Sequence, residues 1–311
     1  MSWLAVAITA YLILAIVNLL DKFLVESVLR NARSYAFIAC ILGLAVFIAA
    51  PWFLAWPGWP LLAWDLMNGA IFAVALWLLY EALHRGEASR ILVLVGGLTP
   101  LFSLLFSLVF FQEQFHAGQW AGIVLISAGV FVIALLPASR SYLARVFSKL
   151  RLSQEDKRNG LWLAIFSALA YSLYFISTKQ AYGAQPFVSA FIWNRLGAAL
   201  FVSLFLLNRD DRRAIIFSFN GAGPSRNKFL IIINQVFGSL GFILQNYAIF
   251  LGSVVLVNAL QGVQYAFLLI TSTGLALLAP RLLRETFSWR ILTQKTVAVA
   301  LVALGLYFIA F

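Results

Sequence analysis

Residues 86–136 read GEASRILVLVGGLTPLFSLLFSLVFFQEQFHAGQWAGIVLISAGVFVIALL. The stretch holds two continuous apolar runs, at 89–111 and 117–137, with five residues between them. A helix needs about 20 apolar residues to cross a bilayer, and each run is close to that length. Neither run has the two-residue alternation of a half-buried strand. The stretch therefore predicts two membrane-spanning helices joined by a short link.

The same pattern extends along the whole chain of 311 residues. The chain is 63% hydrophobic and only 11% charged, whereas a soluble domain is about 25% charged. Its 28 Phe, 10 Trp and 10 Tyr argue against a disordered chain. The composition excludes a water-soluble enzyme and predicts an all-α membrane protein with ten transmembrane helices. The apolar segments are 2–20, 35–56, 61–83, 89–111, 117–137, 160–179, 187–207, 229–250, 254–279 and 295–311.

The positive charge lies on one side of this predicted membrane domain. The net charge is +11, and 20 of the 22 Lys and Arg residues follow segments one, three, five, seven and nine. Loops rich in Lys and Arg stay in the cytoplasm, so both termini are expected to face outward. The basic residues are spread over short loops without a basic helix or an RNA-binding signature, which argues against nucleic acid as a partner.

Few side chains are available for metals, cofactors or catalysis. Cys40 is the single cysteine, and His84 and His116 are the two histidines, so we expect neither an internal disulfide nor a metal cluster. The sequence has no Walker motif, which argues against direct driving by ATP. We therefore expect no cofactor, no metal ion and no catalytic residue.

The two halves of the chain look like repeats. Three pairs of segments align without a gap: 3–22 with 160–179, 68–86 with 234–252, and 120–129 with 296–305. Five helices per copy is an odd number, so the second copy must enter the membrane from the opposite side, as in many transporters with inverted repeats. The predicted organisation is a first repeat over 1–137, a basic cytoplasmic linker over 138–159 and a second repeat over 160–311.

Residues 86–136 resemble the EamA repeat of the drug/metabolite transporter superfamily. The matching features are a small residue and Ser89 before an apolar helix, Pro100 in its middle, Glu113 after it, and Gly122 and Gly129 in the next helix. The second half is similar to the same repeat through Gly252, Glu285 and Gly305, and it carries Arg195 where EamA repeats often have an arginine.

The first half departs from this pattern, because it has no arginine near Cys40, and Ala266 stands where Pro100 would recur. The resemblance implies ten helices around a central cavity that is lined mainly by helices 1, 3, 4, 6, 8 and 9. Many members of the family are thought to have cytoplasmic termini, whereas the charge distribution of this chain predicts the opposite.

Arg195 is the clearest candidate for a functional side chain. It lies about nine residues into the seventh segment, and ionisable groups inside a bilayer are costly and therefore functional candidates. Its guanidinium would bind a carboxylate or phosphate through two parallel hydrogen bonds. The alternative is a structural arginine that reaches the membrane surface or bonds helix-end carbonyls. No carboxylate lies mid-helix, since Asp65, Glu81 and Glu113 fall near helix ends, so the sequence does not support coupling through an embedded carboxylate.

Amide and hydroxyl side chains form stripes on several predicted helices. Residues three or four apart share one face of a helix, where they would contact a substrate or bond a neighbouring helix. In the fourth segment, the expected role of Thr99, Ser103 and Ser107 is to bond the carbonyls of their own helix. The remaining cavity candidates are Asn68, Tyr171, Tyr174, Asn234, Gln245, Asn258, Gln261 and Tyr265.

Three residues are candidates for gating or hinge motion. Lys22 and Lys179 are matched by the repeat alignment, and they would sit at opposite mouths of a cavity or simply anchor helix ends at the membrane surface. Pro100 breaks a backbone hydrogen bond and predicts either a hinge or a static kink.

These features predict a secondary transporter that moves small organic metabolites such as amino acids by alternating access, with export as the expected direction. The alternatives are a lipid-linked or nucleotide-sugar carrier, an integral membrane enzyme, and a non-transporting assembly subunit. The expected partners are a small-molecule substrate and the lipid bilayer, and the fold allows a monomer. The expected location is the cell membrane, such as the inner membrane of a bacterium.

Overall fold

The structure is a computed structural model that describes residues 2–27, 31–85, 88–134, 154–220, 225–278 and 289–310. These ranges contain helices and short connections, and no strand occurs within them. The all-α prediction is therefore confirmed for the described residues. The elements are α1 (Trp3–Ser27), α2 (Ala32–Leu42), η1 (Gly43–Ala49), α3 (Ala50–Phe53), α4 (Trp59–Arg85), α5 (Ala88–Phe110), α6 (Ala117–Ala134), α8 (Gln154–Ala184), α9 (Phe187–Ser203), η2 (Leu204–Leu207), α10 (Arg209–Asn220), α11 (Ser225–Leu251), α12 (Val254–Ala259), α13 (Gln261–Leu278) and α14 (Trp289–Ala310).

The helices have the length and apolarity of membrane spans. Four stretches are long and apolar enough to cross a bilayer: Ala32–Phe53, Trp59–Arg85, Gly160–Ala184 and Phe187–Leu207. Shorter apolar helices occupy Trp3–Asn18, Leu94–Phe110, Ala117–Val132, Val254–Leu268 and Thr293–Ile309. Exposed tryptophans gather where α3 leads into α4, as in the aromatic belt at a membrane surface. The chain is a multi-pass membrane protein, while the number of ten spans stays a prediction.

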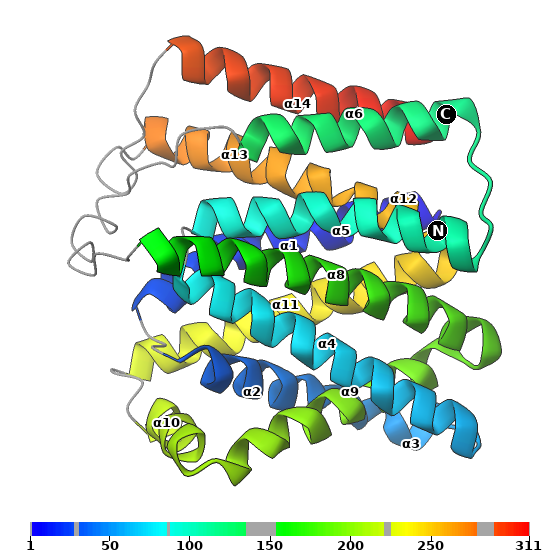
Figure 1. The fold of residues 1–311 in the computed structure, drawn as a ribbon, viewed down its shortest axis with the longest axis vertical. Coiled ribbons are helices and arrows are strands. Elements are labelled where there is room, and N and C mark those ends of the chain that lie inside the picture. Colours follow the sequence, from blue (N-terminus) through cyan, green and yellow to red (C-terminus); the bar gives the residue numbers. More distant parts are fainter. Residues whose placement is uncertain are drawn as a thin grey trace.

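The helices lie side by side, and the N- and C-terminal ends of the chain lie at the same end of the bundle (Figure 1). Helices of one half pack mainly against helices of the other: α4 against α8 and α9, α1 against α11, and α6 against α14. Most large core side chains belong to one continuous apolar cluster that includes Tyr11, Tyr174 and Tyr265.

Small residues let α6 and α14 approach closely. A Cβ on Gly122 would lie 2.8 Å from the Gly305 carbonyl oxygen, and a Cβ on Gly129 would lie 3.0 Å from the Ala298 carbonyl oxygen. The alignment of 120–129 with 296–305 matches Gly122 with Ala298 and Gly129 with Gly305. In this alignment, the contact of Gly122 with Gly305 in one half corresponds to the contact of Ala298 with Gly129 in the other.

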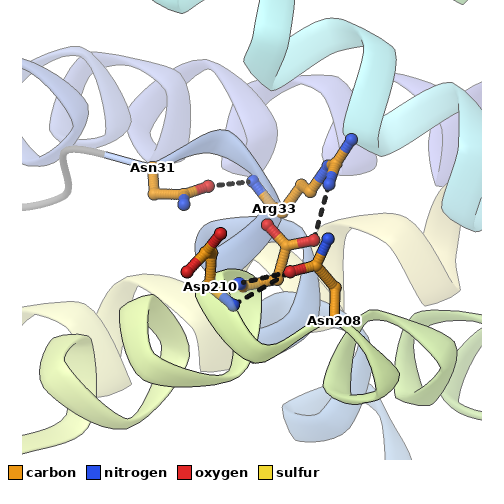
Figure 2. Close-up of polar contacts among 5 residues, drawn as sticks. Asn31, Arg33, Asn208 and Asp210 are labelled. Carbon is orange, nitrogen blue, oxygen red and sulfur yellow. Dashed lines mark hydrogen bonds and ion pairs between the residues drawn. The ribbon is translucent and has the colours of Figure 1, made fainter.

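The structure adds a helix, α10, between the seventh and eighth predicted segments (Figure 2). Asn208 caps it by accepting from the backbone nitrogen of Asp210 at 2.9 Å, and two acidic residues fill its first turn, where the helix dipole favours negative charge. Arg33 of α2 forms an ion pair with Asp211 at 2.5 Å, and Ile215, one turn further along, is buried. These contacts hold α10 against the beginning of α2.

The ninth predicted segment is interrupted. It consists of α12 and α13, which are separated at Leu260, with Asn258 and Gln261 on either side of the break. Leu260 keeps right-handed helical angles, and its backbone nitrogen donates to the Leu256 carbonyl at 3.2 Å, so the break is a single turn residue between two helices that run on. Neither glycine nor proline occupies position 260, so local propensity does not predict this break.

Candidate functional site

Arg195 lies in α9 with its guanidinium inside the bundle, and only 7% of its surface is exposed. Its stem passes Gly43, where an added Cβ would lie 3.5 Å from the Arg195 side chain. Glycine at 197 allows α9 to approach α4, because a Cβ there would lie 2.6 Å from the Leu66 Cα. The packing of glycines on α9 and η1 therefore makes the space that a large cationic side chain occupies.

Three phenylalanine rings surround the guanidinium. The Arg195 Cζ lies 4.1 Å from the ring centre of Phe72 and 4.7 Å from those of Phe191 and Phe242. Ring faces attract a cation, by about 2 kcal/mol or more where water is excluded. We call Phe72, Phe191 and Phe242 the aromatic cage. The cage explains how this segment tolerates a charge, because it offsets part of the cost of burial.

The hydrogen bonds of Arg195 are incomplete. One terminal nitrogen donates to the Tyr174 hydroxyl at 3.0 Å, while the buried Nε has no partner. The Tyr174 hydroxyl donates in turn to the Asn246 side-chain oxygen at 3.2 Å, and that oxygen also accepts from Tyr182 at 3.0 Å. Within the described residues, no carboxylate forms an ion pair with Arg195. The arrangement is a buried cation with donors to spare, which is suited to binding an anion.

Asp65 is the second buried charge in this region. It lies six residues after the start of α4 and is fully buried. Its two carboxylate oxygens accept hydrogen bonds from Gln185 at 2.6 Å and from Asn194 at 3.2 Å. Asp65 lies near the start of α4, as the sequence predicted, and tertiary packing buries its carboxylate, which the sequence did not predict.

The amides of α11 and α12 bond another helix, whereas the amide of α13 bonds a tyrosine of its own helix. Gln245 donates to the Tyr11 hydroxyl at 3.2 Å, and Asn258 donates to Ser103 at 2.9 Å. Gln261 donates to Tyr265 at 3.4 Å, and Tyr265 donates to the Leu92 carbonyl at 2.7 Å. These contacts favour the interhelical role over the substrate role in this conformation, and they leave both roles open for the transport cycle.

The remaining cavity candidates are Asn68 of α4, Tyr171 of α8 and Asn234 of α11. Asn68 accepts a hydrogen bond from Ser177, and its buried Nδ2 has no partner. Tyr171 packs against Phe72 of the aromatic cage, so it lies beside the Arg195 site. Asn234 is fully buried in α11. Of the predicted cavity residues, Tyr174 contacts Arg195 directly. Gln245 bonds α1, and Asn258 and Tyr265 bond α5.

The hydroxyls of α5 behave differently from the expected back-bonding. Thr99 does donate to the carbonyl of its own helix, at Val95. Ser103 instead lies 3.0 Å from the Ser172 hydroxyl and accepts from Asn258, and Ser107 donates to Glu113. Back-bonding is therefore wrong for Ser103 and Ser107, because packing brings other polar groups within reach. Pro100 lies inside α5, between these residues, as the sequence predicted.

Lys179 caps the end of a helix. Its ammonium donates to the backbone carbonyls of Ile249 at 2.8 Å, Phe250 at 3.0 Å and Gly252 at 2.8 Å, at the C-terminus of α11. The last carbonyls of a helix lack backbone partners, and the helix dipole favours a cation there. Neither the gate hypothesis nor the surface-anchor hypothesis for Lys179 included this structural role. The side chain of its repeat equivalent, Lys22, lies outside the described residues.

We expect Lys179→Met to lower the stability of the folded protein by about 2 kcal/mol, because three carbonyls lose a charged donor. The measurement is the melting temperature of the purified protein in detergent, with Arg213→Met, which removes an exposed charge on α10, as the control. Transport per folded molecule should be unchanged. A variant that keeps its melting temperature but stops transporting would instead restore the gate interpretation.

Sequence reasoning missed several residues of this site. Asp65, Gln185 and Tyr182 were not among the candidates, and the phenylalanines of the aromatic cage looked like ordinary core residues. A usable signal did exist for Asn194, which precedes Arg195 directly, since two polar residues in an apolar segment are unusual. The sequence had no signal for the aromatic cage, because its rings come from three helices.

Comparisons with known proteins agree with this fold. Residues 1–135 match the model of the EamA-like transporter family. A solved crystal structure, one of 25 matching chains, is similar to this chain with a TM-score of 0.64 and 18% sequence identity, and the match covers 98% of this chain and 94% of that chain. This likeness supports the fold alone. No curated protein matches the chain.

Proposed function

We propose that the chain, whose residues 1–135 match the EamA-like transporter family, is a membrane transporter that exports small organic metabolites carrying an anionic group, such as amino acids. The observation that carries this proposal is Arg195, a buried cation without an ion-pair partner among the described residues. A substrate carboxylate would supply that partner. The aromatic cage would contact the apolar part of the substrate.

We propose that transport proceeds by alternating access between two inverted repeats, 1–137 and 160–311. Three observations support this organisation. Helices of one half pack on helices of the other, the contacts of Gly122 and Gly129 are exchanged with the halves, and the two ends of the chain lie at the same end of the bundle. The break between α12 and α13 would supply a point at which the second half bends.

A nucleotide sugar or lipid-linked sugar is the second candidate substrate, because its phosphates would also bind Arg195. Proteoliposomes loaded with labelled amino acids, nucleotide sugars or lipid-linked sugars separate these classes. We expect protein-dependent release of an amino acid and none from protein-free vesicles. Release of only the sugar conjugates would favour the second candidate. An assembly subunit or a membrane enzyme would release none of the three.

We expect both termini to face outward and the 138–159 linker to face the cytoplasm, with the protein in the cell membrane. The reason is the one-sided distribution of Lys and Arg, of which 20 of 22 follow odd-numbered segments. The measurement is the activity of a reporter that works only in the cytoplasm, fused after Phe311, with a fusion in the 138–159 linker as the positive control. A strong signal from the Phe311 fusion would reverse the orientation and leave the fold unchanged.

We expect single cysteines at four positions to react slowly with a polar thiol reagent during turnover. Three of the four side chains are buried in this conformation and one is half-buried, so reaction requires another conformation of the transport cycle. The background is Cys40→Ala, the buried control is Val302→Cys at the contact of α6 and α14, and the exposed control is Arg213→Cys. Rates no faster than that of Val302→Cys would identify the four as helix contacts only. The positions are Asn234, Gln245, Asn258 and Gln261.

A further inference from the structure

Asp65 stands out from the other described carboxylates because it is fully buried and has no cation against it. Glu81 is paired with Arg85 at 2.6 Å, and Asp211 is paired with Arg33 at 2.5 Å. Asp65 forms no ion pair within the described ranges, although an isolated buried carboxylate is costly in its charged form. A cation or a proton must therefore neutralise the Asp65 carboxylate for at least part of the time.

The neighbours of Asp65 donate hydrogen bonds. The Asn194 amide is fixed in orientation, because its nitrogen donates both to Asp65 at 3.2 Å and to the Ala190 carbonyl at 2.7 Å. Gln185 presents its nitrogen to the other carboxylate oxygen at 2.6 Å. Amide N–H groups would repel a metal cation placed between them and the carboxylate. The Asp65 carboxylate with its two amide donors is therefore better suited to binding a proton than a metal ion.

Gln185 can serve either protonation state of Asp65. Its amide nitrogen bonds the carboxylate, and its buried oxygen has no partner. Half a turn of this amide would replace the donor by an acceptor, which a protonated carboxyl group needs for its O–H. The Asn194 oxygen is also buried without a partner. Rotation of the Gln185 amide thus gives both the charged and the neutral forms of Asp65 their hydrogen-bond partners.

The charged and titratable groups around this site are few. From α8 they are Tyr174, Tyr182 and Lys179, whose ammonium is engaged with the end of α11. From α9 the charged group is Arg195, which follows Asn194 directly. The contacts of α2 and α5 fall on the later part of α4: Tyr35 and Arg33 of α2 contact Tyr80 and Trp77, and Ile91 of α5 shares a cluster with Ala82.

We propose that Asp65 is a proton-binding site, which takes a proton from water onto its carboxylate and returns it to water during the transport cycle. Its link to substrate rests on the proposed function. Asn194 donates to Asp65 and precedes Arg195 directly in α9, so an anion bound at Arg195 and a proton bound at Asp65 act on the same turn of one helix.

The first test needs no substrate. Infrared spectra of the purified protein, recorded across a pH titration, report the carbonyl stretch of protonated carboxyl groups. We expect a titrating band that is lost in Asp65→Asn and kept in Glu81→Gln, the matched control on the same helix. A band that survives in Asp65→Asn would overturn the proposal. The asparagine has the shape of aspartate, and the Gln185 oxygen can accept from its new nitrogen.

A second variant keeps the test decisive if Asp65→Asn folds poorly. Gln185 is only half-buried, so Gln185→Met should fold, and it removes one hydrogen bond that favours the charged carboxylate. We expect its band to titrate at higher pH than in the unaltered protein. An unchanged titration would contradict the proposed site.

A third measurement separates this inference from the proposed function. In proteoliposomes, transport by the unaltered protein should vary with pH, and transport by Asp65→Asn should lose that variation. If the Asp65 band titrates but no metabolite is transported, the proton site stands and the proposed substrates are wrong. If transport occurs with the same pH dependence in Asp65→Asn, the proton site is wrong and the proposed function stands.

Discussion

Arg195→Ala is expected to reduce transport of an anionic substrate by about 10-fold to 100-fold per folded molecule, which corresponds to the loss of about 1.5–3 kcal/mol from a charged hydrogen bond. The substrate carboxylate would lose its partner, while the aromatic cage would remain. The measurement is initial transport rate in proteoliposomes, divided by the amount of folded protein. Arg213→Ala, which removes an exposed arginine from α10, is the control and should transport normally.

Arg195→Lys should recover only part of the lost transport. Lysine keeps the positive charge and loses the planar fork that binds a carboxylate through two bonds. The melting temperature must be measured with both variants, because alanine also leaves a space inside the aromatic cage. If Arg195→Ala lowers the melting temperature and transports normally per folded molecule, Arg195 is structural and leaves the site.

Gly69→Ala is expected to destabilise the protein by about 3 kcal/mol or more, because α4 and α9 touch at this position. A Cβ on Gly69 would overlap the Asn194 carbonyl oxygen and would lie 2.5 Å from the Ala198 nitrogen. These are backbone atoms, so they can yield only if the two helices separate. The separation would also displace Asn194 and Arg195. The measurement is the yield and melting temperature of the purified variant.

Gly183→Ala is the matched control for this variant. Gly183 also lies in a helix, α8, but a Cβ there would meet no atom within 4 Å. Alanine is the better helix former, so stability should be unchanged or slightly higher. If Gly69→Ala melts at the same temperature as Gly183→Ala, the close approach of α4 and α9 is wrong.

The sequence by itself determined the fold class and the approximate helix boundaries. The seventh segment was predicted at 187–207 and is occupied by α9 and η2 over the same range, and the third was predicted at 61–83 within α4. Apolar length is a local property that a membrane imposes on each span separately, so it can be found without knowing which helices are neighbours. The same reasoning identified Arg195, because a charge in an apolar segment is conspicuous wherever that segment packs.

Tertiary structure alone decided what these side chains touch. Lys179 bonds carbonyls that lie about 70 positions away in the chain, and the aromatic cage takes Phe72, Phe191 and Phe242 from three helices. Asp65 is near a helix end in the sequence, yet Gln185, in the connection after α8, and Asn194 of α9 supply the amides that bond it. The break at Leu260 and the docking of α10 also depend on neighbouring elements. Helix pairing is set by small residues and shape over the whole bundle, and this information is not present in any one segment.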